Sequence, residues 1–212
     1  QVYEKGVFSF CMCPGGIIAP AATSPGEIVV NGWSPSKRNN PFANSGIVVS
    51  VEVKDLDKKF GRDPLSLMRF QQSVEQLAFQ AGGGNLQAPA QRLVDFCEKR
   101  SSSTLPVCSY LPGIASVNMQ EVLPAFIYER LQVGFRQVGE KMKNYFTNEA
   151  VVVATESRTS SPVRIPRDPQ LLSHPQLSTL FPCGEGAGYA GGIVSAAMEG
   201  EKVAAAIINQ LA

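Results

Sequence analysis

Several features that mark particular classes of protein are missing from this sequence. No run of eighteen or more apolar residues occurs in the 212 residues, so no transmembrane helix is predicted. Nineteen Lys and Arg residues balance 18 Asp and Glu residues without forming a basic stripe, which argues against a nucleic-acid partner. A single histidine, His174, leaves too few nitrogen ligands for a typical zinc site. We therefore predict no membrane, nucleic-acid or metal partner.

The amino terminus also lacks a secretion signal. Residues 1–5 (QVYEK) are not followed by the long apolar core of a signal peptide. Five cysteines, an odd number at irregular spacing, do not form a paired framework and favour reduced thiols. These features predict a cytoplasmic protein. The absence of an initial methionine favours a fragment or a processed chain.

The composition and the hydrophobic pattern predict an α+β fold. Hydrophobic residues make up 44% of the chain and charged residues 17%, as in a globular protein. Alternating or β-branched runs predict strands at residues 7–10, 16–19, 27–30, 44–53, 150–155, 163–165 and 177–183. Helical spacing predicts helices at residues 63–81, 89–99, 119–146 and 192–211.

Two of these helices carry further local signals. Asp63 is a favourable N-cap, and Gly82 follows the last residue of the apolar pattern Leu67, Phe70, Val74, Leu77 and Ala81. The last helix carries an apolar stripe of Ile193, Ala197, Ala204, Ile207 and Leu211.

From this order of elements we predict a mixed β-sheet domain interrupted by a helical insertion. Residues 1–55 form the first part of the sheet, 56–147 the helical insertion, and 148–176 the returning β-rich segment. Residues 177–212 form a strand, a loop and a helix that belong to another domain.

The loop at residues 181–192 (FPCGEGAGYAGG) is the most informative segment. Gly186, Gly188 and Gly191 match the spacing of the dinucleotide-binding fingerprint. Glycines allow a ligand to approach the main chain closely, and the following helix offers unpaired amides. A true fingerprint is followed by a second strand with an acidic residue, whereas here only a helix follows. A different use of the loop, or a plain glycine-rich turn, fits better.

Three phrases resemble a known protein family. These are FCMCPGG at residues 10–16, ESRTSSPVRI at 156–165 and FPCGEGAGYAGGI at 181–193. Together they resemble the bacterial FAD-dependent dehydrogenases that are described as NAD- or FAD-utilizing dehydrogenases, over nearly the whole chain. The resemblance implies a carboxy-terminal portion whose amino-terminal half, with the ADP-binding strand and helix, is not present in this sequence.

The resemblance also implies roles for individual residues. Gly184 and Glu185 occupy the Gly-acid position of such flavoproteins, with Glu where many have Asp, and the helix start faces the flavin. The implied FAD-contacting residues are Gly184, Glu185, Gly186, Gly188, Gly191, Gly192 and Ile193. Arg158 and Arg164 are the implied catalytic residues, holding the carboxylate of a small-molecule substrate or balancing the charge of reduced flavin. NAD(P)H is the implied electron donor.

Other interpretations of the same residues remain open. Each arginine alone is equally compatible with an ordinary surface salt bridge, for example to Glu156. Cys11 and Cys13 suggest a thiol-redox protein, although closely spaced cysteines such as these more often serve packing. A third possibility is a non-catalytic binding or regulatory module on a flavoprotein-like fold. His174, which precedes Pro175, is interpreted as structural.

The implied missing half leads to a first prediction. Because the ADP-binding element is not part of this sequence, the isolated chain should be colourless after purification. Titration with FAD in a calorimeter should give no stoichiometric binding heat. Tight binding of FAD by this chain alone would contradict the implied division of the cofactor site.

Overall fold

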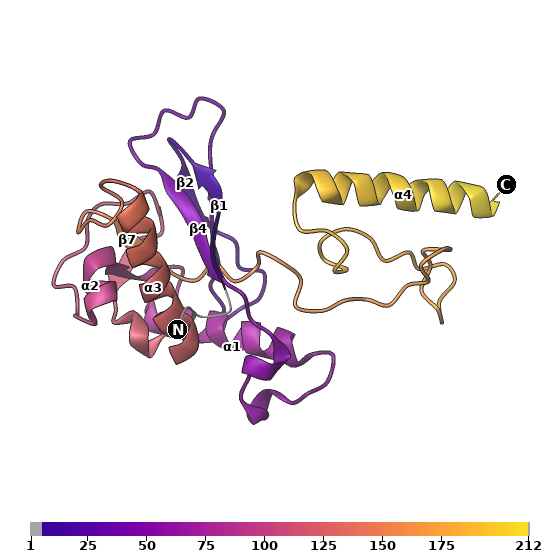
Figure 1. The fold of residues 1–212 in the computed structure, drawn as a ribbon, viewed down its shortest axis with the longest axis horizontal. Coiled ribbons are helices and arrows are strands. Elements are labelled where there is room, and N and C mark those ends of the chain that lie inside the picture. The colour runs from indigo at the N-terminus through magenta and orange to yellow at the C-terminus, as the bar shows by residue number, and fades with distance from the viewer. Residues whose placement is uncertain (1–5, 212) are drawn as a thin grey trace. The chain divides into compact units, whose positions relative to one another are not determined.

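The computed structural model describes residues 6–211 and divides them into two compact units (Figure 1). Unit 1 comprises residues 6–51 and Gln72–Ser157. Unit 2 comprises Glu52–Gln71 and residues 158–211. Residues 1–5, on which the signal-peptide prediction rests, lie outside the described part of the chain. Helices and small sheets occur together, which confirms the predicted α+β class.

Two antiparallel strand pairs open unit 1. Strand β1 (Val7–Cys13) pairs with β4 (Asn44–Val49), and β2 (Ile17–Pro20) pairs with β3 (Val30–Trp33). The predicted strand at 27–30 was wrong in extent, because β3 begins only at Val30. Residues 27–29 bond elsewhere: the Ile28 amide donates to the Glu75 carbonyl, and the Val29 carbonyl accepts from Ala21.

A three-stranded mixed sheet forms the second part of unit 1. Its central strand, β5 (Ala88–Arg92), lies parallel to β6 (Ile114–Ser116) and antiparallel to β7 (Val151–Val153). The predicted helix at 89–99 was therefore wrong in its first half, and helix α2 spans only Leu93–Glu98. Ala88 and Ala90 are fully buried, so these small residues, which also suit helices, serve here to pack the centre of a sheet.

The longer helices of the chain follow the predicted pattern more closely. Helix α1 (Ser66–Ala81) begins after Asp63, whose carboxylate accepts from the Leu65 amide, and the Gly82 amide bonds to Ala78 at its end. Leu77 is 46% exposed while Ala78 is fully buried, so the predicted stripe was wrong at that position. Helix α3 spans Ala125–Lys141. Short 3₁₀ helices lie at Val53–Asp55, Lys58–Phe60 and Met119–Glu121.

The core of unit 1 forms where α3 covers the end of α2. The last carbonyls of a helix have no partner within it. Here α3 supplies the missing donors: Tyr128 Oη bonds to the Phe96 carbonyl (2.6 Å), Gln132 Nε2 bonds to both Phe96 and Cys97 (3.0 Å each), and Arg136 bonds to Cys97 (2.9 Å). These donors are spaced four residues apart and therefore lie on one face of α3. Burial raises the pKa of the Cys97 thiol to about 11, so this cysteine is unreactive.

Unit 2 is built mainly without regular secondary structure. Among the described residues from 158 to 192 there is only an isolated bridge between His174 and Leu177, and helix α4 (Ile193–Leu211) follows (Figure 1). The predicted strands at 163–165 and 177–183 are not formed. Single backbone bonds replace a ladder there, from Ile165 to Ala187 and from His174 to Leu180. No helix in the described part of the chain is long and apolar enough to cross a membrane.

The packing of α3 gives a second prediction. A Cβ atom at Gly134 would lie 2.7–2.8 Å from the side chain of Val7 on β1, so Gly134→Ala forces α3 away from the strand. We expect a loss of about 1–3 kcal/mol in the free energy of unfolding, measured by urea denaturation. Gln137→Ala, an exposed position in the same helix, is the control and should change stability by less than about 0.5 kcal/mol. Equal stability of the two variants would contradict the close approach.

Candidate functional site

The glycine-rich loop of unit 2 folds as a compact turn. The Gly188 amide bonds to the Glu185 carbonyl (2.9 Å), and the Tyr189 amide bonds to the Gly184 carbonyl (2.9 Å). Gly184 and Gly188 have positive φ angles of 73° and 82°, a conformation that favours glycine. The turn therefore projects main chain, with few side chains, on its outer surface.

The segment at residues 161–165 supports the loop from one side. Ser161 Oγ donates to the Gly186 carbonyl (3.1 Å), and the Ile165 amide donates to Ala187 (3.1 Å). A Cβ atom at Gly188 would lie 2.8 Å from the Val163 carbonyl oxygen, so packing alone requires glycine at this position. The structure thus brings together two of the phrases that carry the family resemblance, at 156–165 and 181–193.

The opposite side of the loop is open. A Cβ atom added at Gly184, Gly186, Gly191 or Gly192 would meet no other atom within 4 Å. Glu185 is exposed, with its carboxylate available to a ligand. Since no side chain of this unit fills the surface above these glycines, a planar or charged group can approach the main chain directly.

The start of α4 provides hydrogen-bond donors beside this open surface. Ser195 Oγ accepts from the Gly191 amide (3.2 Å) and donates to the Gly192 carbonyl (2.9 Å), which fixes the first turn. None of the described residues accepts a hydrogen bond from the amides of Gly192 or Ile193. Unpaired amides at a helix start attract a carbonyl oxygen or an anion. Both amides were predicted from the sequence, but Ser195 was not. A hydroxyl at the third position of the predicted helix was the signal that could have identified it.

A cluster of charged and aromatic side chains joins the loop to α4. Arg167 stacks over the Tyr189 ring (3.6 Å to its centre), donates to the Pro182 carbonyl (2.9 Å) and forms an ion pair with Glu199 (2.8 Å). The two charged side chains are only 6% and 16% exposed. Arg164 lies over the same ring (4.4 Å). Arg167 was missed in the sequence because it stands outside the phrases that drew attention to Arg158 and Arg164.

The second predicted arginine, Arg158, has a different setting. It is half-buried and directly follows Ser157, whose hydroxyl donates to Glu75 Oε1 (2.6 Å). Glu75 is 1% exposed, and Glu27, with 4% exposure, accepts from Gln72 (2.8 Å). Two buried carboxylates in unit 1 therefore adjoin the point where the chain passes to unit 2. Neither was singled out in the sequence, since an isolated Glu gives no signal.

The remaining candidate residues have local structural contacts. The Cys13 thiol is buried and donates to the Cys11 carbonyl (3.1 Å), an interaction that packs the end of β1. His174 Nδ1 accepts from the Gln176 amide (3.1 Å), which stabilises a turn. Both contacts agree with the structural interpretation of these residues.

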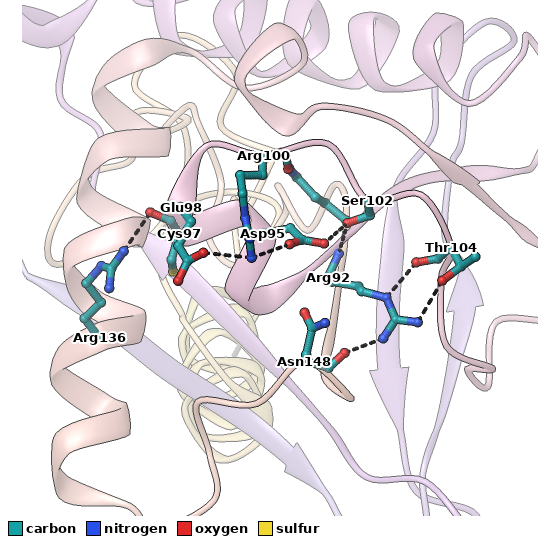
Figure 2. A network of polar contacts seen from close by, with 10 residues as sticks. Arg92, Asp95, Cys97, Glu98, Arg100, Ser102, Thr104, Arg136 and Asn148 are labelled. Atoms are coloured by element: carbon teal, nitrogen blue, oxygen red, sulfur yellow. Dashed lines mark hydrogen bonds and ion pairs between the residues drawn. The ribbon is translucent and has the colours of Figure 1, made fainter.

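Unit 1 contains a polar cavity of about 560 Å³ at the end of β5. Figure 2 shows the Arg92 guanidinium bonded to the carbonyls of Thr104 and Asn148 (2.6 Å each). Asp95 accepts from Arg100 (3.0 Å) and from Ser102 (2.9 Å). Because these charged groups already pair with one another or with main chain, the network holds the loop at 100–104 in place.

Comparison with known proteins identifies the family. Residues 1–159 match the family described as FAD-dependent protein, C-terminal domain-like. The chain belongs to this family. A member of this FAD-dependent family is related to flavoproteins, as the resemblance of the three phrases implied. The match ends within two residues of the boundary between Ser157 and unit 2, so the family domain corresponds to unit 1 together with residues 52–71.

A relative extends the similarity through the glycine-rich loop. An uncharacterized protein of Clostridium beijerinckii is 43% identical over 209 residues, which cover 98% of this chain. The chain spans only 38% of that relative's length. The similarity therefore includes α4, beyond the limit of the family domain.

The buried ion pair of unit 2 yields a third prediction, on pH. Hydrogen bonding to Arg167 holds the pKa of Glu199 below its usual range. A lowered folded-state pKa adds stability above the usual glutamate pKa of about 4.3, and this contribution is lost as the pH falls through the folded value. At pH 7 the Glu199→Gln variant should therefore have a lower melting temperature than the unchanged chain. This difference should shrink below pH 4.

Circular dichroism of the helical signal measures this difference. Glu201→Gln, an exposed position two residues further along α4, is the matched control and should melt like the unchanged chain at every pH. A Glu199→Gln variant that melts like the unchanged chain at pH 7 would show that the ion pair does not stabilise the unit.

Proposed function

We propose that this chain is the carboxy-terminal part of a bacterial, cytoplasmic FAD-dependent oxidoreductase, and that its glycine-rich loop contacts the flavin. The observation that supports the proposal best is the open main-chain surface at residues 184–192, flanked by the unpaired amides of Gly192 and Ile193. Membership of an FAD-dependent family supports the choice of cofactor.

The residues present fit a flavin nucleotide. Gly184, Gly186, Gly191 and Gly192 have no neighbouring atom that a ligand would displace. The Glu185 carboxylate is a suitable acceptor for ribityl or ribose hydroxyls. The positive end of α4 suits an electron-rich carbonyl oxygen. Gly188 contributes by shaping the loop, since its own surface is covered by Val163.

In this proposal bound FAD would supply the chemistry of hydride transfer between a small-molecule substrate and an electron donor such as NAD(P)H. The residues of this chain bind the flavin and stabilise negative charge on it. The amides of Gly192 and Ile193 donate hydrogen bonds toward negative charge, without reorganisation during the reaction. Arg164 and Arg158 supply positive charge for a small-molecule substrate or for the reduced state.

The remainder of the whole protein completes the cofactor site. The greater length of the relative supports the existence of further chain. Helix α4 exposes Ile193, Val194, Met198 and Ile208, apolar side chains that a folded protein normally covers. Val203, with 6% exposure, is its only buried apolar side chain among the described residues, and the side chain of Leu211 lies outside the description. We propose that the ADP-binding half of the same protein packs against this helix.

Substitution of the open glycines tests the proposal in the whole protein. Gly186→Ala and Gly191→Ala place a methyl group on the open surface without a clash within this chain. We expect FAD affinity to fall by about tenfold or more, since each loses close main-chain contact worth at least about 1.4 kcal/mol. Flavin absorbance and fluorescence titration measure the affinity.

Gln137→Ala, at an exposed position of α3 in unit 1, is the control, and FAD affinity should remain within twofold. Unchanged FAD affinity in both loop variants would overturn the assignment of the loop. A whole protein without flavin bands, even after addition of FAD, would favour a non-catalytic module instead.

The thiol-redox alternative is tested in the same protein. If Cys11 and Cys13 transferred electrons, replacing both by Ser would abolish turnover. We expect turnover to be unchanged, because the Cys13 thiol is buried and bonded to main chain.

A further inference from the structure

Unit 2 contains a cavity next to the glycine-rich loop, and Arg164 is the only residue of its lining to which the proposed function assigns a role. It has a volume of about 480 Å³, within the range of small-molecule sites. Its lining consists of Arg164, Pro166, Arg167, Pro169, Leu172, Tyr189 and Lys202. One part of the wall is therefore cationic, and another part is apolar.

The charges around this cavity do not cancel. Arg164, Arg167 and Lys202 contribute three positive charges. Glu199 compensates one of them through its ion pair with Arg167 (2.8 Å), while Lys202 Nζ lies 3.9 Å from the same carboxylate and is 57% exposed. Asp168 does not line the cavity, and its carboxylate accepts from the amides of Gln170 and Leu171. Three cations thus share one carboxylate, which leaves a net charge of two to attract an anionic ligand.

Arg164 is more available to a ligand than Lys202. No hydrogen bond or ion pair joins its guanidinium to another described residue, and its position is set by contact with the Tyr189 ring (4.4 Å). The ring itself is fixed, because Tyr189 Oη donates to the Ile165 carbonyl (2.9 Å) and Arg167 stacks on it. The rigid ring therefore holds at the edge of the cavity a guanidinium that lies within electrostatic range of Glu199 but forms no hydrogen bond or ion pair with it.

From this arrangement we propose that the cavity binds a dianionic phosphate monoester that carries an apolar group. Arg164 offers a fork of donors and Lys202 a point charge, the two kinds of cation that bind phosphate. Pro166, Pro169 and Leu172 contact the apolar part of the ligand. The assignment does not depend on the flavin contact of residues 184–192, and it adds Lys202 as a binding residue.

Calorimetry on the FAD-loaded whole protein tests the proposal with phenyl phosphate as the probe. Phenyl phosphate should bind more tightly than inorganic phosphate, because of the apolar wall, and more tightly than benzoate, a monoanion of similar shape. Affinity should fall from pH 8 to pH 5, as the phosphate loses its second charge near a pKa of about 6.

Three variants and a control identify the residues. Arg164→Gln and Lys202→Gln should each lower the affinity for phenyl phosphate about tenfold. The double variant should lower this affinity by more than either single variant. Lys58→Gln removes one exposed charge elsewhere in unit 2 and should leave binding unchanged. All four proteins should retain their FAD, so failure of this site is distinguishable from failure of the flavin loop.

Three outcomes would overturn the proposal. The first is that phenyl phosphate does not bind, or that it binds the double variant as tightly as the unchanged protein. The second is benzoate binding as tightly as phenyl phosphate at pH 8. The third is displacement of phenyl phosphate by FAD in protein stripped of flavin, which would assign the cavity to the cofactor's own diphosphate.

Discussion

Arg167 is the side chain on which the organisation of unit 2 depends. Residues 158–192 contain no ladder or helix that could hold them by repeated main-chain bonds. The Arg167 guanidinium instead contacts three segments. It bonds to the Pro182 carbonyl, stacks on Tyr189 in the loop and pairs with Glu199 on α4. Because the ion pair is shielded from water, loss of either partner would leave an uncompensated charge in a poorly solvated position. The position of the helix start relative to the glycines follows from this contact.

The glycines of the loop divide into two physical classes. Gly188 is glycine because Val163 leaves no room for a side chain. At Gly186, Gly191 and Gly192 there is room for a side chain, yet the residue is glycine. Glycine at these positions lowers the stability of the folded chain, because glycine loses more conformational entropy on folding than alanine does. The proposed flavin contact, which needs the main chain bare, would account for glycine at these three positions.

Part of this structure could be predicted from the sequence. Caps and stops such as Asp63 and Gly82 act locally and located α1 within a few residues, and the long apolar patterns located α3 and α4. Strand β5 was mistaken for a helix because Ala88 and Ala90 suit either state, and only the neighbouring strands decide between them. The pattern at 177–183 predicts a strand, but in the described chain the segment makes only an isolated bridge and a single bond with His174 and has no partner strand. The loop was found by its glycines, whereas Arg167 and Ser195 matter through contacts that no local pattern reveals.

The boundary after Ser157 has a consequence for the order in which the protein is made. The last strand of unit 1, β7, ends at Val153, so every residue of that unit has left the ribosome before the loop and α4 emerge. Domains begin to fold as soon as their residues are available during translation. The family domain can therefore fold before the final helix has been synthesised, and the described residues leave most of the apolar side chains of that helix exposed.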